Sequence, residues 1–169
     1  ITPDANYAMN GAYFSNGTTG AAYVFTRSGT SWSQQAKLVA SDAASADYFG
    51  WHAAISSDAS YAIVGARGEE TTSGTNDNYG AAYIYVRSGT SWSQQAKLVA
   101  SDGAVGHKFG WRVAMNSDGT YAAVTSYEAV NGSVNYAGAV YVFTRSGTSW
   151  TQQAKLLASD GASYDNYGR

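Results

Sequence analysis

Apolar and polar residues alternate along short segments of this chain. Within Ala81–Arg87, Tyr83 and Tyr85 fall on one side of an extended backbone, and Ala82 and Ile84 fall on the other. Alternation with a period of two residues is typical of β-strands. No window of comparable length shows a convincing helical period. The pattern therefore predicts an all-β fold built from short strands.

Four such segments form one unit in the middle of the chain. A Ser-Asp turn at Ser57 and Asp58 separates the first two segments, a loop of variable sequence follows, and a Ser-Gly-Thr turn separates the last two. Asp and Gly favour such turns because they form local hydrogen bonds and tolerate positive φ. The expected strands are Trp51–Ser56, Tyr61–Ala66, Ala81–Arg87 and Trp92–Ala100.

This unit is repeated along the chain. The segment RSGTSWSQQAKLVASD at residues 27–42 recurs unchanged at residues 87–102, and it recurs as RSGTSWTQQAKLLASD at residues 145–160. Recent duplication explains this near-identity, and a contact that every copy must make is the alternative explanation.

Four antiparallel strands repeated at intervals of about 60 residues are typical of β-propeller blades. Each blade needs a neighbour to cover its second face. We therefore treat residues 1–169 as a single propeller module of about three blades. The blade repeats are expected at residues 1–42, 49–102 and 109–160, and residues 167–169 begin a further blade.

The order of short motifs in the unit resembles the FG-GAP repeat over essentially the whole chain. Phe49-Gly50 and Phe109-Gly110 carry the "FG" pair, and Val64-Gly65-Ala66 stands at the "GAP" position, with Arg67 in place of proline. FG-GAP repeats form the blades of integrin α-subunit propellers and of many secreted microbial and algal proteins. The resemblance therefore implies a propeller fold and an extracellular or cell-surface location.

Many FG-GAP blades also carry a calcium loop of the form Asp-x-Asp-x-Asp-Gly, and this sequence contains no such run. Its nearest acidic loop, residues 68–78, has a different spacing of oxygen ligands. We therefore assign no cofactor and no metal ligand, and we keep calcium as an alternative.

Composition and charge exclude several other classes of protein. Charged residues make up 13% of the chain, aromatic residues 14%, and the net charge is −2. Abundant aromatic residues argue against a disordered chain, and the absence of basic runs argues against a nucleic-acid partner. No apolar stretch is long enough for a membrane span. The chain has no cysteine, which excludes disulfides, thiolate zinc sites and a cysteine nucleophile.

The repeats do not add up to a closed propeller. Residues 1–42 contain only the last three strands of a blade, whereas residues 167–169 match the start of the missing first strand. Three blades are also fewer than the usual four to eight. We expect the first blade to be completed in trans by another copy, or by further repeats, with Ile1 and Arg169 as the assembly termini. The residues expected to pack between blades are Trp32, Trp92, Trp150, Phe49, Phe109 and Tyr167.

No group of residues points to catalysis. His52 and His107 lack a paired ligand pattern, no Gly-x-Ser-x-Gly motif is present, and the acidic residues of the variable loops are expected to be solvated. Those loop acids are Glu69, Glu70, Asp77 and Glu128. A second acidic set recurs near the strand ends and is expected to form turn and backbone hydrogen bonds between blades, with a cation site as the alternative: Asp42, Asp47, Asp102, Asp160 and Asp165.

Two features suit an extracellular surface. Asn16 and Asn131 lie in N-x-[ST] sequons, both in the variable loop of their repeat, and are candidate glycosylation sites. The repeated tryptophans could also stack on sugars, although packing between blades is the simpler interpretation. The same choice applies to the loop tyrosines Tyr13, Tyr79, Tyr127 and Tyr136.

These observations favour a non-enzymatic extracellular protein of structural or adhesive type. We expect it to self-associate through blade–blade and strand-edge contacts, in a filament or a surface layer, with glycans or cell-surface proteins as further partners. A glycan-binding lectin propeller is the alternative function. A third is a ligand-binding propeller attached to an enzyme that lies outside these residues.

Overall fold

A computed structural model describes residues 1–70 and 77–169, and these residues form eleven strands. The all-β prediction is confirmed. Within the described residues, no helix is long and apolar enough to cross a membrane. The first sheet contains β1 (Tyr7–Ala12), β2 (Ala21–Ser28) and β3 (Ser31–Leu38); the second contains β4 (Phe49–Ile55), β5 (Tyr61–Ala66), β6 (Ala81–Ser88) and β7 (Ser91–Leu98); the third contains β8 (Phe109–Met115), β9 (Tyr121–Ser126), β10 (Ala139–Ser146) and β11 (Ser149–Leu156).

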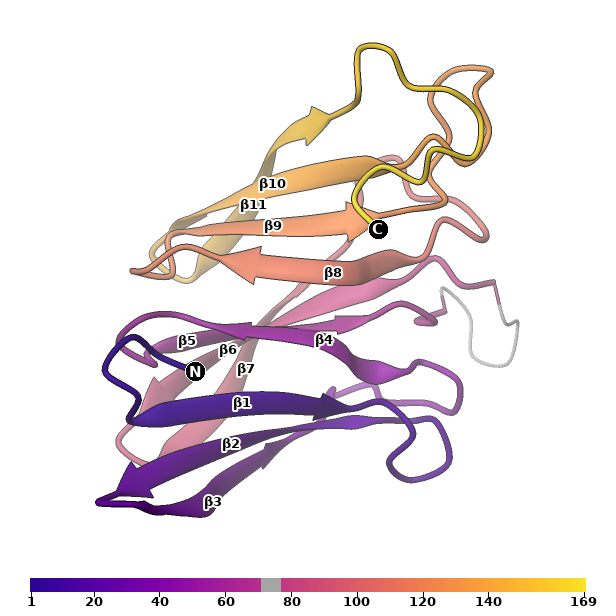
Figure 1. Cartoon of the computed structure of the whole chain (residues 1–169). Coiled ribbons are helices and arrows are strands. Elements are labelled where there is room, and N and C mark those ends of the chain that lie inside the picture. Colours follow the sequence, from indigo (N-terminus) through magenta and orange to yellow (C-terminus); the bar gives the residue numbers. More distant parts are fainter. Residues whose placement is uncertain (71–76) are drawn as a thin grey trace.

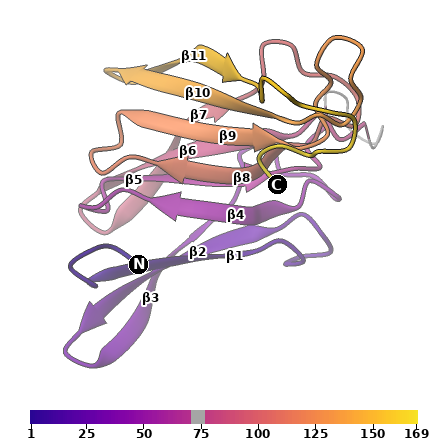
Figure 2. The same cartoon turned by 45° about the horizontal axis from the view of Figure 1, so that its top comes forward.

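All strand pairs within the sheets are antiparallel, and each four-stranded sheet follows the chain order from one edge to the other. Figure 1 shows the three sheets stacked as successive layers, with β1, β4 and β8 along the same edge of the stack. The turned view in Figure 2 shows the same order of layers in an open row. These are propeller-like blades whose row does not close into a ring within the described part of the chain.

The predicted strands agree with the observed ones in the middle sheet. Strand β5 has the predicted bounds, whereas β7 starts one residue earlier and ends two residues earlier than predicted. Tyr83 and Tyr85 of β6 contribute to the core shared with the first sheet, and Ala82 and Ile84 to the core shared with the third. The alternation predicted from the sequence is therefore confirmed, and it serves to cover both faces of this sheet.

The glycine of each Phe-Gly pair lies where a strand of one sheet comes very close to a strand of the sheet before it. Gly50 has a φ of +86° and faces Gly11 of the first sheet, where an added Cβ would lie 1.9 Å from the Gly50 carbonyl oxygen. Gly110 repeats this arrangement against Gly65 at 2.1 Å. No side chain fits at these positions, so glycine sets the spacing between the sheets at their inner edge.

A β-bulge lies in the last strand of every sheet. In the first sheet Val24 pairs with Ala36 and Phe25 pairs with Gln34, so Gln35 has no partner on β2. The same shift leaves Gln95 and Gln153 unpaired in the second and third sheets. A bulge re-aims the side chains that follow it. It therefore changes which residues of the QQAKL segment face each neighbouring sheet.

The chain continues past the third sheet into the start of a further inner strand. Tyr167 forms a parallel bridge with Gly138, just as Phe49 bridges Gly20 and Phe109 bridges Gly80. Phe49 and Phe109 are buried, whereas Tyr167 is 40% exposed. Residues 167–169 thus lie where the next blade would begin.

Candidate functional site

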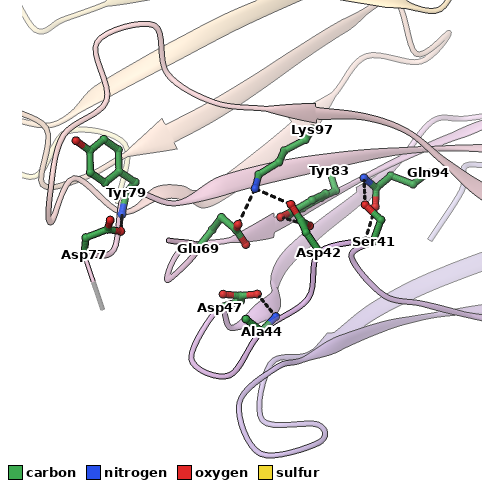
Figure 3. Close-up of polar contacts among 10 residues, drawn as sticks. All are labelled: Ser41, Asp42, Ala44, Asp47, Glu69, Asp77, Tyr79, Tyr83, Gln94 and Lys97. Atoms are coloured by element: carbon green, nitrogen blue, oxygen red, sulfur yellow. Dashed lines mark hydrogen bonds and ion pairs between the residues drawn. The ribbon is translucent and has the colours of Figure 1, made fainter. Parts of the chain in front are cut away.

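The polar junction between the first two sheets has Asp42 at its centre. Asp42 follows β3, and its carboxylate accepts a hydrogen bond from the Tyr83 hydroxyl at 2.9 Å and pairs with Lys97 Nζ at 2.7 Å (Figure 3). Burial raises the pKa of Asp42, but the hydrogen bonds from Lys97 and Tyr83 outweigh burial and hold its pKa below the ordinary value. At Asp42, side-chain bonds between the sheets thus add to the local backbone bonding expected from the sequence.

Two glutamines complete this junction. The Gln94 side chain accepts from Ser41 N at 2.9 Å and donates to Ser41 Oγ at 3.0 Å, as Figure 3 shows. Trp92 Nε1 donates to Oε1 of the bulged Gln35 at 3.0 Å. Each bond joins β7 to residues of the first sheet or to the segment after it, so the bonds position the two blades relative to each other.

The second junction repeats the contacts of Asp42, Gln94 and Trp92 at the first. Tyr141 OH lies 2.8 Å from Asp102 Oδ1, and Lys155 Nζ lies 2.7 Å from Asp102 Oδ2. Gln152 forms the corresponding pair of hydrogen bonds with Ser101, at 3.0 and 2.9 Å. Trp150 Nε1 donates to Oε1 of the bulged Gln95 at 3.1 Å. The repeated segments therefore form the same five hydrogen bonds and ion pairs at both interfaces between blades.

Aromatic rings pack beneath each of these polar contacts. Phe49 lies edge-on to Tyr83, with ring centroids 5.5 Å apart, and Phe109 lies edge-on to Tyr141 at 5.4 Å. Trp92 and Trp150 pack against the same two cores. Trp32, by contrast, lies on the outer face of the first sheet and is 41% exposed.

The first junction also contains a group of carboxyls. Lys97 Nζ lies 2.6 Å from Glu69 Oε1, and the buried Asp47 lies beside Glu69 in Figure 3, where it accepts from Ala44 N at 2.5 Å. Burial is the main cause that raises the pKa of Asp47 to about 7. The Ala44 hydrogen bond opposes this rise, and the neighbouring Glu69 and Glu70 charges add to it. The prediction that Glu69 is solvated is wrong, because its carboxylate is buried against Lys97.

The cluster formed by the carboxylates of Asp42, Asp47 and Glu69 does not fit a calcium site. The Lys97 ammonium already neutralises Asp42 and Glu69, whereas calcium requires six to eight oxygen ligands around one point. In the described residues, no three His, Asp or Glu side chains are grouped to hold a metal ion. Part of the acidic loop considered above, residues 71–76, lies outside the described residues.

The remaining acidic candidates lie apart from one another. Asp165 accepts from Ala162 N at 2.6 Å, which repeats the Asp47 turn on an exposed surface. Glu128 pairs with Lys108 at 2.8 Å. Asp160 is exposed after β11, and Asp77 accepts from Tyr79 N.

The two histidines occupy separate, half-buried positions. Burial lowers the pKa of His52 and of His107 below the ordinary histidine value. His52 Nδ1 accepts a long hydrogen bond from Val113 N at 3.4 Å, and His107 Nδ1 has no hydrogen-bond partner among the described residues. The structure does not bring them together.

An aromatic row lies along the inner edge of the stack, and the sequence analysis did not identify it as a unit. Tyr13 contacts Trp51 at 4.5 Å between centroids, Trp51 contacts Trp111 at 4.7 Å, and Trp111 contacts Tyr127 at 4.1 Å. The Arg67 guanidinium lies 4.0 Å from the Trp51 ring centroid. The repeated Phe-Gly-Trp motif was the signal that could have identified Trp51 and Trp111.

The other loop tyrosines lie outside this aromatic row. Tyr136 stacks on Tyr164 at 5.1 Å. Tyr79 borders a hollow of about 360 Å³ together with Lys97 and Val99. The sequence placed Tyr13, Tyr79, Tyr127 and Tyr136 in one class, and the structure separates them into three places.

The two sequons occupy matching connections. Asn16 is exposed between β1 and β2, with a φ of +52°, and Asn131 lies between β9 and β10. The β1–β2 connection of the three-stranded first sheet corresponds to the β9–β10 connection of the four-stranded third sheet. Any modification of these residues would project from the same end of the stack.

Comparison with known families agrees with this architecture. The model of the FG-GAP repeat matches residues 32–85, 92–143 and 150–169. Each match starts at the tryptophan of an outer strand and runs into the next sheet, so one sequence repeat spans two blades. A search among curated proteins finds no similar sequence. The matched residues cover most of the chain, and the chain therefore belongs to the FG-GAP repeat family.

Proposed function

We propose that this chain is a non-enzymatic extracellular repeat module of structural or adhesive type, which works through blade–blade contacts and the display of its loops. The observation that carries this proposal is that both internal junctions share one recurring set of contacts, made by aspartate, tyrosine, lysine, glutamine, serine and tryptophan at matching positions. The Tyr83–Asp42 and Tyr141–Asp102 bonds are one example of this repetition. A contact made the same way at every blade supports an assembling scaffold.

Several observations support the extracellular part of this proposal. FG-GAP repeats are typical of extracellular proteins, and the FG-GAP model matches most of this chain. The sequons at Asn16 and Asn131 lie in matching connections between strands. Such loops tolerate bulky additions without disturbing the sheets.

A second candidate is glycan binding, and the aromatic row favours it. Sugar rings stack on exposed indole and phenol faces through their C–H groups, and Tyr13 and Trp51 border a hollow of about 300 Å³ next to β1 and β4. His52 and Asn10 supply polar groups at the same hollow. A saccharide is the ligand chemistry that fits this combination.

The test immobilises the protein on beads and measures adhesion to cell surfaces and to a glycan array. The structural or adhesive function predicts adhesion that does not fall when free sugars are added. The lectin function predicts array binding that free sugar competes away and that falls at least about tenfold in Trp51→Ala. Tyr164→Ala is the control, because it removes an exposed aromatic ring that stacks on Tyr136 and lies outside the aromatic row. Beads that bind neither surface would contradict both functions.

A further inference from the structure

Two sheet faces of this chain have no other described sheet against them. The outer face of the first sheet presents Tyr23, Arg27, Trp32, Gln34 and Lys37. The outer face of the third sheet presents Tyr121, Gln153, Leu156, Ser159 and Asp160. We call these the first-sheet face and the third-sheet face.

Each residue of the first-sheet face matches one that already forms a junction inside the chain. Trp32 corresponds to Trp92 and Trp150, which donate to the bulged Gln35 and Gln95. The matching bulged glutamine on the third-sheet face is Gln153, which would accept the hydrogen bond from Trp32. The repeated segment makes this correspondence residue by residue. The third-sheet face is thus the surface onto which the first-sheet face would dock.

The two open faces also carry the two partners of the lysine–aspartate ion pair. Lys97 pairs with Asp42 and Lys155 pairs with Asp102, each at 2.7 Å. The residues at the same positions on the open faces are Lys37 and Asp160. Tyr23 matches the tyrosine that donates to that aspartate, and Gln34 and Ser159 match the glutamine–serine pair. The two faces are therefore complementary in charge and in hydrogen bonding.

A cation–π contact between an arginine and a tyrosine joins neighbouring sheets at the other end of the strands, and its two partners also recur on the open faces. The Arg87 guanidinium lies 4.9 Å from the Tyr7 ring of the preceding sheet, and Arg145 lies 4.2 Å from Tyr61 of the sheet that precedes its own. The matching open pair is Arg27 and Tyr121, which is 45% exposed. A junction between the two open faces would bury this ring under a guanidinium.

The apolar centre of the third-sheet face is uncovered. Leu156 is 44% exposed, whereas the corresponding Leu38 and Leu98 are each 3% exposed inside the junctions. A hollow of about 260 Å³ at the ends of β8 and β9 is lined mainly by apolar groups, including Met115 and Val142, and it also borders Tyr121. Covering these groups removes apolar surface from water, which favours association.

The first-sheet face already holds its docking side chains in the geometry of a junction. Lys37 Nζ lies 5.9 Å from the Tyr23 ring centroid, compared with 5.6 Å for Lys97 over Tyr83. Arg27 Nε donates to a carbonyl of the preceding turn at 2.6 Å, as Arg87 does at 2.7 Å. Such preorganisation lowers the entropy lost on binding.

We infer that the third-sheet face of one copy of this chain binds the first-sheet face of a second copy, through the same contacts that join the sheets within the chain. This inference rests on the proposed function and names the partner as the chain itself. The contact is head-to-tail, so it generates a ring where the rotation closes. Two copies of three sheets would give six blades, inside the usual range for propellers, and we expect a dimer.

The test measures native mass by light scattering and sedimentation for the whole chain between 1 and 100 µM, concentrations chosen to span moderate affinities. We expect wild type to reach about twice the 17.8 kDa of one chain. Lys37→Glu and Asp160→Lys should each weaken association at least about tenfold, because each places like charges opposite each other at the junction. An equal mixture of these two variants restores opposite charges at both contacts, so the mixture should associate like wild type.

Lys37→Arg keeps the charge and is the matched control, and circular dichroism checks that every variant folds. The inference is overturned if wild type stays at the mass of one chain at 100 µM, or if the two variants associate as well alone as they do when mixed. Adhesion of a non-associating chain to cell surfaces would then still support the proposed function. Loss of adhesion in a chain that does dimerise would overturn the proposed function alone.

Discussion

At the scale of single residues, Asp47 shows how burial changes a turn carboxylate. Its side chain caps Ala44 N in the same way that Asp165 caps Ala162 N in the third repeat. Asp47, however, is 1% exposed and lies beside Glu69, whose Oε2 is buried and has no hydrogen-bond partner among the described residues. A proton on Asp47 relieves both the buried charge and the repulsion between the two carboxylates.

This proton predicts a specific dependence of stability on pH. The pKa of Asp47 is raised to about 7 in the folded chain from 3.8, so the folded state binds the proton more tightly than the unfolded state. The contribution of Asp47 to the free energy of unfolding is therefore highest near pH 4 and falls as the pH rises to about 7. Asp47→Asn keeps an acceptor for Ala44 N and cannot ionise. Relative to wild type, this variant should gain stability between pH 4 and pH 8 in urea unfolding.

The matched control for this experiment is Asp165→Asn, which changes the equivalent turn on an exposed surface. The interpretation fails if the difference in unfolding free energy between Asp47→Asn and wild type is the same at pH 5 and pH 8.

At the scale of elements, the start of each inner strand and the bulge of each outer strand determine how blades meet. Gly110 sits at φ +89°, and an added Cβ would lie 2.1 Å from the Ala81 carbonyl oxygen. The bulge at Gln95 places Gln94 and Lys97 toward the first sheet, while Gln95 itself bonds to Trp150 of the third. A regular strand would not place these side chains in this way, because its side chains alternate at every residue.

The close approach of the sheets at the start of β8 can be tested by adding one methyl group at Gly110. Gly110→Ala should cost about 3 kcal/mol or more of unfolding free energy, because a backbone atom blocks the Cβ and the left-handed φ is strained. Gly89→Ala is the control, since its φ is +61° and no atom lies within 4 Å of the added Cβ. It should cost only about 1 kcal/mol. Equal losses for both variants in denaturant unfolding would show that close approach of the sheets is not the cause.

At the scale of the whole molecule, the three sheets differ in how many faces are covered. The second sheet is covered on both sides, and its residues contribute to both cores, whereas the first and third sheets each have one open face. Because each blade depends on its neighbours for burial, stability is expected to decrease from the middle of the stack outward.

Hydrogen exchange on the matched third strands measures this gradient. Strands β2, β6 and β10 have almost the same sequence and position, so they serve as controls for one another. In dilute protein, the amides of β6 should exchange at least about tenfold more slowly than those of β2 and β10. Equal protection in the three strands would instead show that the stack opens as one unit.

The amino-acid sequence alone determined the all-β class, the repeat and the two-sided β6, because period-two alternation and recurring turns are local signals. It also identified the Phe-Gly pairs and the repeated tryptophans as interface residues to be tested. Only the tertiary structure showed that Glu69 is buried against Lys97, that Trp51 and Trp111 form one row, and that Gln35 bonds to Trp92. Each contact joins residues far apart in the sequence, and the last two join residues from different sheets. Their geometry depends on sheet spacing and on a one-residue bulge, neither of which is written in any local pattern of the chain.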